Sequence, residues 1–205
     1  KRMHLVNKIK ELSEKYFDDT LANRRHIHQH PELSFEEHKT AEFIVKKLKE
    51  YGLNPVTGIA GTGITALIEG QGDKVFALRA DMDALPIKEA NDVPYKSVNE
   101  GIMHACGHDV HSASLLTSAR ILNNLKDQLK GKVKLIFQPG EEKAPGGASK
   151  MIAEGVLKDP VPHGILGQHV MPLLPVGKVG FRSGQYMASA DEIYLHVKGS
   201  GGHGA

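Results

Sequence analysis

The sequence reads HDVHSASLLTSARILNNL over residues 108–125 and VKLIF over residues 133–137. In the first stretch the apolar residues recur at the spacing of one face of a helix; they are Leu115, Leu116, Ala119, Leu122 and Leu125. The second stretch is a short apolar run of strand length, and a Gln-Pro-Gly turn signal ends it. A helix that leads into a strand is typical of the α/β layer folds, and this is the fold class that we predict.

The remaining chain continues the alternation of helix and strand. Apolar spacing predicts helices at residues 5–12 and 21–29, and Pro31 ends the second of them. A third helix is predicted to begin at Ser34, which has Glu37 at the spacing of a capping box, and to stop at Gly52. Short apolar runs predict strands at residues 64–68, 75–78, 164–167 and 176–181, and a short helix is expected at residues 148–154.

The character of the sequence changes near residues 183–184. An alternating pattern at residues 192–197 predicts a strand, and a glycine-rich segment with a histidine, GSGGHGA, follows at residues 199–205. Such a segment is typical of a connection between structured elements. We therefore predict one domain over residues 1–185 and the beginning of a second, truncated domain over residues 186–205.

The composition narrows the class of protein. A formal charge of +2 with no long run of either sign argues against binding to nucleic acid or to an anionic membrane, so a small-molecule partner is expected. The single cysteine cannot form an internal disulfide. The sequence contains no signal-peptide pattern and no apolar stretch of bilayer length, which makes a cytoplasmic location the expectation. Twelve histidines are unusual in a chain of 205 residues, and histidine accumulates where metals or protons are handled.

Groups that bind metals follow the predicted strands and their connections. They are Asp81-Met82-Asp83, Cys106-Gly107-His108-Asp109, Glu141-Glu142 and His169. The ends of strands are the usual place for a site in an open α/β sheet. Thiolate, imidazole and carboxylate together are the ligands of zinc-like divalent ions, so the pattern predicts a catalytic metal site.

Each of these groups also has a simpler interpretation. Cys106 could reach an ion together with His108 across the small Gly107, or it could be a buried apolar side chain. Of the adjacent carboxylates Glu141 and Glu142, one could bind the ion while the other stands beside the activated water, or both could be solvated charges.

The acidic and histidine positions around this segment leave similar choices. Either Asp81 or Asp83 could orient a ligating histidine, or could cap a helix. His169 could be the last ligand, although a lone histidine is more often structural. Histidines also stand at positions 26, 28 and 30, and we interpret them as the edge of an amphipathic helix because no carboxylate accompanies them at ligand spacing.

Several motifs together resemble the M20 peptidases, in the branch that includes aminoacylases, hippurate hydrolases and auxin-conjugate hydrolases. The motifs are Arg24-Arg25, His28 with Pro31-Glu32-Leu33, RADMDALP at 79–86, MHACGHD at 103–109, QPGEE at 138–142 and Gly201-Gly202-His203. The resemblance covers residue 20 to the end. It implies a zinc-peptidase-like catalytic domain with a mixed sheet sandwiched by helices, of which residues 1–185 are the N-terminal part. Residues 186–205 would then be the first strand of an inserted α+β lid domain that mediates homodimerisation.

The resemblance also implies the roles of the site residues. Cys106, His108, Glu142 and His169 would bind two divalent ions, which could be Zn, Mn, Co or Ni. Glu141 would be the general base, and Asp83 the acidic residue that orients the site. His203 would match a lid histidine that steadies the oxyanion at the partner subunit's substrate. The implied reaction is hydrolysis of an N-acyl amino acid or a dipeptide-like substrate.

Members of this family are roughly twice as long as this chain and supply a further histidine ligand, which would lie beyond residue 205. The resemblance therefore implies a fragment with weak or absent activity on its own. Two other functions remain compatible with the residues: an amidase in which Cys106 is the nucleophile, and a metal-binding module without catalysis.

Overall fold

The computed structural model describes residues 2–189, 191 and 193–204. The chain divides into two units, Lys1–Val170 and Met171–Ala205. The first unit contains all the helices and strands of the described residues.

A mixed five-stranded sheet forms the centre of the first unit, in the order β1-β2-β4-β3-β5. The strands are β1 (Val56–Ile59), β2 (Gly63–Ile68), β3 (Val75–Asp81), β4 (Lys132–Gln138) and β5 (Ile165–Gly167). β3 runs parallel to β4 and β5, whereas β2 runs antiparallel to β1 and β4. The predicted mixed α/β fold is confirmed. Sequence reasoning missed β1, a short and mostly exposed strand without an alternating pattern.

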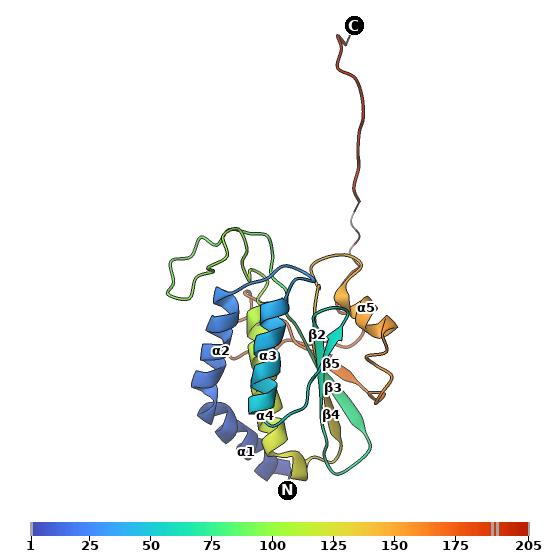
Figure 1. Cartoon of the computed structure of the whole chain (residues 1–205). Coiled ribbons are helices and arrows are strands. Elements are labelled where there is room, and N and C mark those ends of the chain that lie inside the picture. Colours follow the sequence, from blue (N-terminus) through green and yellow to red (C-terminus); the bar gives the residue numbers. More distant parts are fainter. Residues whose placement is uncertain (1, 190, 192, 205) are drawn as a thin grey trace. The chain divides into compact units, whose positions relative to one another are not determined.

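Helices lie on both faces of this sheet (Figure 1). On one side α3 (His38–Glu50) and α4 (His108–Asn124) pack on the strands, and α1 (Arg2–Lys15) and α2 (Phe17–Gln29) pack against α4. On the other side α5 (Gly147–Ala153) packs against β4. A short 3-10 helix, η1 (Lys126–Gln128), follows α4.

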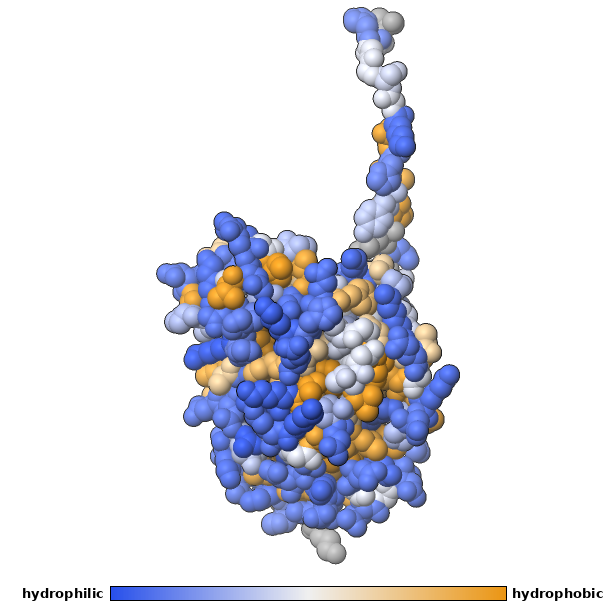
Figure 2. All heavy atoms as spheres, in the orientation of Figure 1, coloured by the Kyte–Doolittle hydropathy of each residue, from blue (hydrophilic) through white to orange (hydrophobic). Residues whose placement is uncertain are grey.

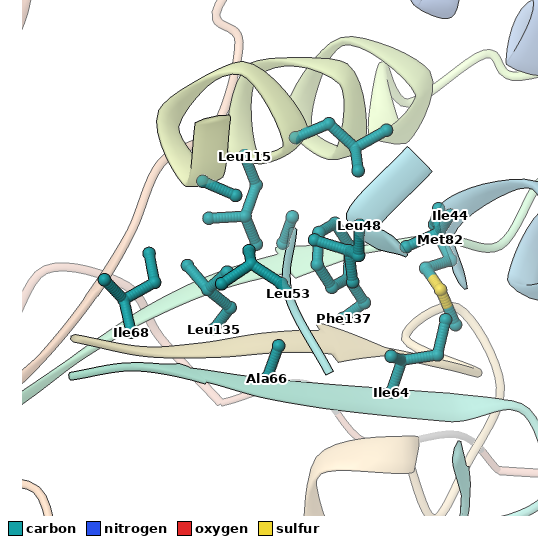
Figure 3. Packing of buried hydrophobic residues seen from close by; sticks show 13 residues of the cluster. Ile44, Leu48, Leu53, Ile64, Ala66, Ile68, Met82, Leu115, Leu135 and Phe137 are labelled. Carbon is teal, nitrogen blue, oxygen red and sulfur yellow. The ribbon is translucent and has the colours of Figure 1, made fainter. Parts of the chain in front are cut away.

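The main core lies between the sheet and the pair α3–α4. Leu48 of α3 and Leu115 of α4 extend toward Leu135 and Phe137 of β4, as Figure 3 shows. Because side chains alternate along a strand, Ile136 between these two residues faces the opposite side and packs near Met151 of α5. The same strand thus holds helices on both faces.

Parallel pairing brings three strand ends to one edge of the sheet. Asp81 at the end of β3 is paired with Gln138 at the end of β4, and Arg79 of β3 is paired with Gly167 at the end of β5. The segments that leave these three strands therefore begin beside one another. This edge carries the groups that the sequence predicts to bind a metal.

The start of α3 differs from the prediction. The carboxylate of Glu32 accepts hydrogen bonds from the backbone amides of Lys39 and Thr40, so Glu32 satisfies the first turn of the helix. Ser34 and Glu37 form no capping box: the Ser34 hydroxyl donates to Asp83, and the Glu37 side chain is buried. The capping-box prediction was wrong because both side chains have distant partners that the local spacing does not show.

The second unit also differs from the prediction. Residues 176–181 form no strand, and neither do the described residues 193–197; Glu192, in the predicted strand at 192–197, lies outside the described residues. Apolar side chains in this unit are exposed, among them Val176, Phe181 and Leu195. An alternating pattern predicts which side of a strand is apolar, but a strand also needs a neighbour for its backbone hydrogen bonds, and none pairs with these residues among those described.

None of the described helices is both long enough and apolar enough to span a membrane. Hydrophilic side chains cover most of the face drawn in Figure 2, and smaller apolar areas interrupt them.

Candidate metal centre

His108 lies at the centre of the site and is the first residue of α4. The preceding Gly107 has a φ of 92°, in the left-handed region, and a Cβ at this position would clash with the side chain of Val170. The His108 side chain is fully buried. Its Nδ1 donates to the backbone carbonyl of Asp83 at 2.9 Å and faces an Asp83 carboxylate oxygen at 3.2 Å. These contacts fix the ring and leave Nε2 as the atom with a free lone pair.

Two buried polar atoms face each other at this position without a hydrogen-bond partner among the described residues. They are Nε2 of His108 and Oε1 of Glu142, which lie 3.8 Å apart. A carboxylate oxygen of Glu141 lies 3.9 Å from the same Nε2. Leaving a buried polar atom without a partner costs about 1–3 kcal/mol. A divalent cation that accepted electron pairs from both atoms would remove this cost, so the residues fit a metal ion.

Cys106 and His169 complete the group. The Cys106 thiol lies 3.3 Å from Nε2 of His169, whose Nδ1 donates to the backbone carbonyl of Val170 at 2.6 Å. Nε2 of His169 is therefore an acceptor directed toward the sulfur. Burial, together with the acidic side chains of Glu142, Glu141 and Asp81, raises the pKa of Cys106 to about 12. Nucleophilic cysteines have a lowered pKa, so this environment disfavours a cysteine nucleophile and is consistent with a thiol that a cation deprotonates.

The structure thus brings together all four predicted ligands. The donor atoms of Cys106, His108 and His169 lie within 4.8 Å of one another, and so do those of His108, Glu141 and Glu142. His108 belongs to both groups. Residues from three separate segments of the chain, 106–108, 141–142 and 169, meet at one edge of the sheet.

A third group of possible ligands, Asp81, His108 and His111, has a structural explanation. Nδ1 of His111 donates to Asp81 at 2.6 Å, and Nε2 of His111 accepts the amide of Val170 at 2.9 Å. The other Asp81 oxygen accepts a hydrogen bond from Arg79 at 2.6 Å. Burial raises the pKa of Asp81, but His111 and Arg79 more than offset it and lower the pKa to about 2. Both nitrogens of His111 are in use, so Asp81 orients His111. The Asp81 oxygen that accepts from Arg79 also lies 3.7 Å from Nε2 of His108.

Asp83 contacts both His108 and the segment that carries Glu142, but it does not face the free Nε2 of His108. In addition to the contacts with His108, its carboxylate accepts hydrogen bonds from the Ser34 hydroxyl at 2.6 Å and from the Glu142 backbone amide at 2.9 Å. Burial raises its pKa, and the donors His108, Ser34 and Glu142 together lower it below the ordinary value. Asp83 is therefore placed to orient His108 and the segment that carries Glu142.

Glu141 is the most open carboxylate at the site, with 42% of its side chain exposed. Its pKa is raised above the ordinary value, first by burial and then by the negative charge of Glu142. A carboxylate that is partly open, close to the possible metal ligands and of raised pKa has the properties of a general base.

His28 belongs to one of the motifs that resemble the family, but its partners in the structure were not predicted. It is buried, and its ring donates from Nδ1 to Asp109 at 2.8 Å and from Nε2 to Glu89 at 3.0 Å. Nε of Arg24 lies 2.8 Å from the same Asp109 oxygen. The interpretation of His28 as part of a helix edge was wrong, because its carboxylate partners are far away in the sequence. His26 conforms better to that interpretation, since its ring stacks on Phe43 at 4.2 Å.

Two further histidines that the sequence analysis named, His104 and His203, lie in different surroundings. His104, which flanks the Cys-Gly-His-Asp motif, is buried without a hydrogen-bond partner among the described residues, and burial lowers its pKa to about 4. His203 is exposed and belongs to the unit Met171–Ala205. Its role in binding the oxyanion stays a prediction.

The sequence is similar to known proteins over most of its length. Residues 77–199 match the family model described as Peptidase family M20/M25/M40. The chain is 44% identical over 198 residues to the N-acyl-L-amino acid amidohydrolase of Geobacillus stearothermophilus, an alignment that covers 96% of this chain and 53% of that protein. It is 43% identical over 183 residues to the hippurate hydrolase of Campylobacter jejuni, covering 89% of this chain and 47% of that protein.

A solved structure is also similar. The YXEP protein of Bacillus subtilis, described as a dinuclear metal-binding peptidase of the M20 family, superposes with a TM-score of 0.75 at 43% identity. The superposition covers 80% of this chain and 46% of that one. The chain spans about half the length of the relatives that it matches.

Proposed function

Because the chain belongs to peptidase family M20/M25/M40, we propose that it carries the metal centre of an amidohydrolase that cleaves the amide bond of N-acyl amino acids. The observation that supports a metal most directly is the pair of buried atoms, His108 Nε2 and Glu142 Oε1, that face each other without hydrogen-bond partners among the described residues. The names of the relatives support the substrate class, since they include an N-acyl-L-amino acid amidohydrolase and a hippurate hydrolase.

In this proposal the residues have three roles, which are to bind the ions, to position the ligands and to transfer the proton. Cys106, His108, Glu142 and His169 bind two divalent ions, and Asp83 positions His108 and Glu142. When bound, such ions would activate a water molecule and polarise the amide carbonyl. Glu141 accepts the proton of the attacking water and delivers it to the leaving nitrogen, as a general base that then acts as a general acid.

The ligand set does not select one metal. A thiolate favours softer ions such as Zn or Co, whereas carboxylate and imidazole ligands also suit Mn or Ni. We propose further that His203 contacts the substrate of a partner subunit in a homodimer formed through a lid domain, and that the protein is cytoplasmic. We also propose that residues 1–205 are a fragment with weak or absent activity in isolation.

Two alternatives predict different behaviour. A cysteine nucleophile predicts activity that survives chelation and is lost on alkylation of Cys106, and the raised pKa of that thiol disfavours it. A metal-binding module without catalysis predicts bound metal and no hydrolysis by the full-length gene product.

The test begins with metal analysis of the 205-residue chain, because all four proposed ligands lie in it. The full-length gene product is then assayed on N-acetyl and N-benzoyl amino acids, with and without chelator. Glu141→Gln should retain the metal and abolish hydrolysis, whereas Glu14→Gln, which changes an exposed glutamate of α1, should behave like the parent. A fully active Glu141→Gln variant would refute the assignment of the base, and a metal-free parent that still hydrolyses amides would refute the metal centre.

A further inference from the structure

The turn that carries Glu141 is held from both sides by buried carboxylates. The backbone amide of Gly140 donates to Oε1 of Glu37 at 2.7 Å, and the backbone amide of Glu142 donates to Asp83 at 2.9 Å. These amides belong to the residues immediately before and after Glu141. The orientation of Glu141 therefore depends on two acceptors that are far from it in the sequence.

Glu37 is an unusual residue to find in this position. Its side chain has 0% exposure, and no Lys, Arg or His side chain forms an ion pair with it among the described residues. Its other partners are the Phe35 backbone amide at 2.9 Å and the Thr62 hydroxyl at 2.5 Å. A buried carboxylate without a positive partner destabilises a fold compared with an apolar side chain of similar size. Stabilisation of the core therefore does not explain why Glu37 is present at this position.

The segment around Glu37 fits closely against the turn. Phe35 has a φ of 68°, a left-handed conformation that is strained for a bulky residue. In this conformation its ring covers Gly140, where a Cβ would clash with it. Ser34 donates to Asp83, the second of the two carboxylates. Residues 34–37 therefore contact the Gly140 end of the turn directly and reach the Glu142 end through Asp83.

We propose that Glu37 is a positioning residue that holds the turn of residues 140–142 through the Gly140 amide and thereby orients the Glu141 carboxylate. This inference rests on the proposed function for the role of Glu141. Glu37 itself does not contact Glu141 or any of the proposed ligands through a hydrogen bond among those described. Its effect passes through the backbone of the turn.

The first measurement is amide hydrogen exchange at Gly140 by NMR on the metal-free 205-residue chain. Glu37→Met keeps the length of the side chain but removes both acceptors, and we expect Gly140 exchange to accelerate by about ten-fold or more, as expected for a lost hydrogen bond to a charged group. Glu37→Gln keeps one carbonyl acceptor and can donate to Thr62, so exchange should stay within about three-fold of the parent. Glu37→Asp keeps the charge but shortens the side chain, and it replaces Glu37→Met if that variant does not fold.

The second measurement is steady-state hydrolysis by the full-length gene product with metal bound. We expect Glu37→Met to lower kcat by roughly 10- to 100-fold with KM within about two-fold, and Glu37→Gln to restore most of kcat. Leu12→Ala is the matched control, since it destabilises the buried cluster beneath α1, which contains none of the site residues. It should lower stability without lowering kcat.

Parent-like exchange at Gly140 and parent-like kcat in both Glu37→Met and Glu37→Asp would overturn the inference. So would a loss of kcat in Leu12→Ala equal to that in Glu37→Met. If the parent binds no metal and hydrolyses no amide, the proposed function fails, while the exchange at Gly140 still decides whether Glu37 holds the turn.

Discussion

Replacement of Asp83 by Asn tests whether Asp83 positions both His108 and the segment that carries Glu142. The Asp83 carboxylate accepts hydrogen bonds from the Ser34 hydroxyl at 2.6 Å and from the Glu142 amide at 2.9 Å, and it faces Nδ1 of His108 at 3.2 Å. Asparagine has almost the same shape but only one acceptor oxygen. Its amide group must then direct N–H toward at least one of these donors.

The magnitude follows from the bonds that are lost. A hydrogen bond to a charged group contributes about 1.5–3 kcal/mol, and each 1.4 kcal/mol corresponds to about a ten-fold change in an equilibrium constant. If Asp83→Asn loses one such bond at the site, the affinity for a divalent metal should fall by roughly 10- to 150-fold. Ser34→Ala removes one donor but keeps the carboxylate, so its effect should be clearly smaller.

The assay is competition between the metal-free 205-residue chain and a fluorescent chelator for Zn²⁺ and for Mn²⁺. Asp127→Asn removes the charge of an exposed aspartate in η1 and is the control for net charge. Urea unfolding of each variant without metal shows whether the fold persists. If folded Asp83→Asn binds both metals as tightly as the parent, Asp83 does not position the ligands and the reasoning is refuted.

Three other predictions concern the core, pH dependence and the thiol. Leu116→Ala removes a side chain with 0% exposure, so the free energy of unfolding in urea should fall by about 2–5 kcal/mol, and a change under 1 kcal/mol would contradict the described packing. The hydrogen bond to Asp109 raises the pKa of His28 against the effect of burial, with Glu89 adding to the rise. Protonated His28 therefore contributes its full stabilisation below pH ~6.5, and this contribution is lost as pH rises through the higher pKa of the folded state. His28→Gln should make the free energy of unfolding in urea decline less between pH 6 and pH 9. An unchanged decline would exclude His28 as its source. In the metal-free chain, a Cys106 pKa of about 12 against 9.0 for an ordinary thiol leaves about a thousand-fold less thiolate. Iodoacetamide should therefore react slowly with Cys106 at pH 8, as followed by mass spectrometry. A reaction as fast as that of free cysteine would contradict the described burial.

Much of the secondary structure could be predicted because it depends on local spacing. The helical face that ends at Leu125 and the apolar run that became β4 both matched the structure closely. Where the prediction failed, the deciding partner was either distant in the sequence or absent among the described residues. Residues 176–181 have the composition of a strand, but no neighbouring strand pairs with them among the described residues. Ser34 has the spacing of a helix cap, but its hydroxyl is bound to Asp83, 49 residues away.

The candidate site could be predicted as a set of residue types but not as a network. Cys106, Glu142 and His169 were predicted as ligands because they follow strands or lie beside a histidine at short range. The pairing of His28 with Asp109, 81 residues away, leaves no local pattern, and neither does the hydrogen bond between Glu37 and Gly140. Buried carboxylates that bind backbone amides are invisible to sequence spacing, since the amide partner can belong to any residue.

The pairing of Asp81 with Gln138 across β3 and β4 also determines how precisely the sheet must assemble. A slip of one residue between two strands displaces them by about 3.3 Å and turns every side chain of the slipped strand to the opposite face. His108 Nε2 and Glu142 Oε1 are 3.8 Å apart, so a slip of this size would be comparable to the whole separation of the two donors. Apolar residues of β4 such as Leu135 and Ile136, which pack on opposite faces, therefore do more than fill the core. They favour the one alignment of the strands that places these two donor atoms 3.8 Å apart.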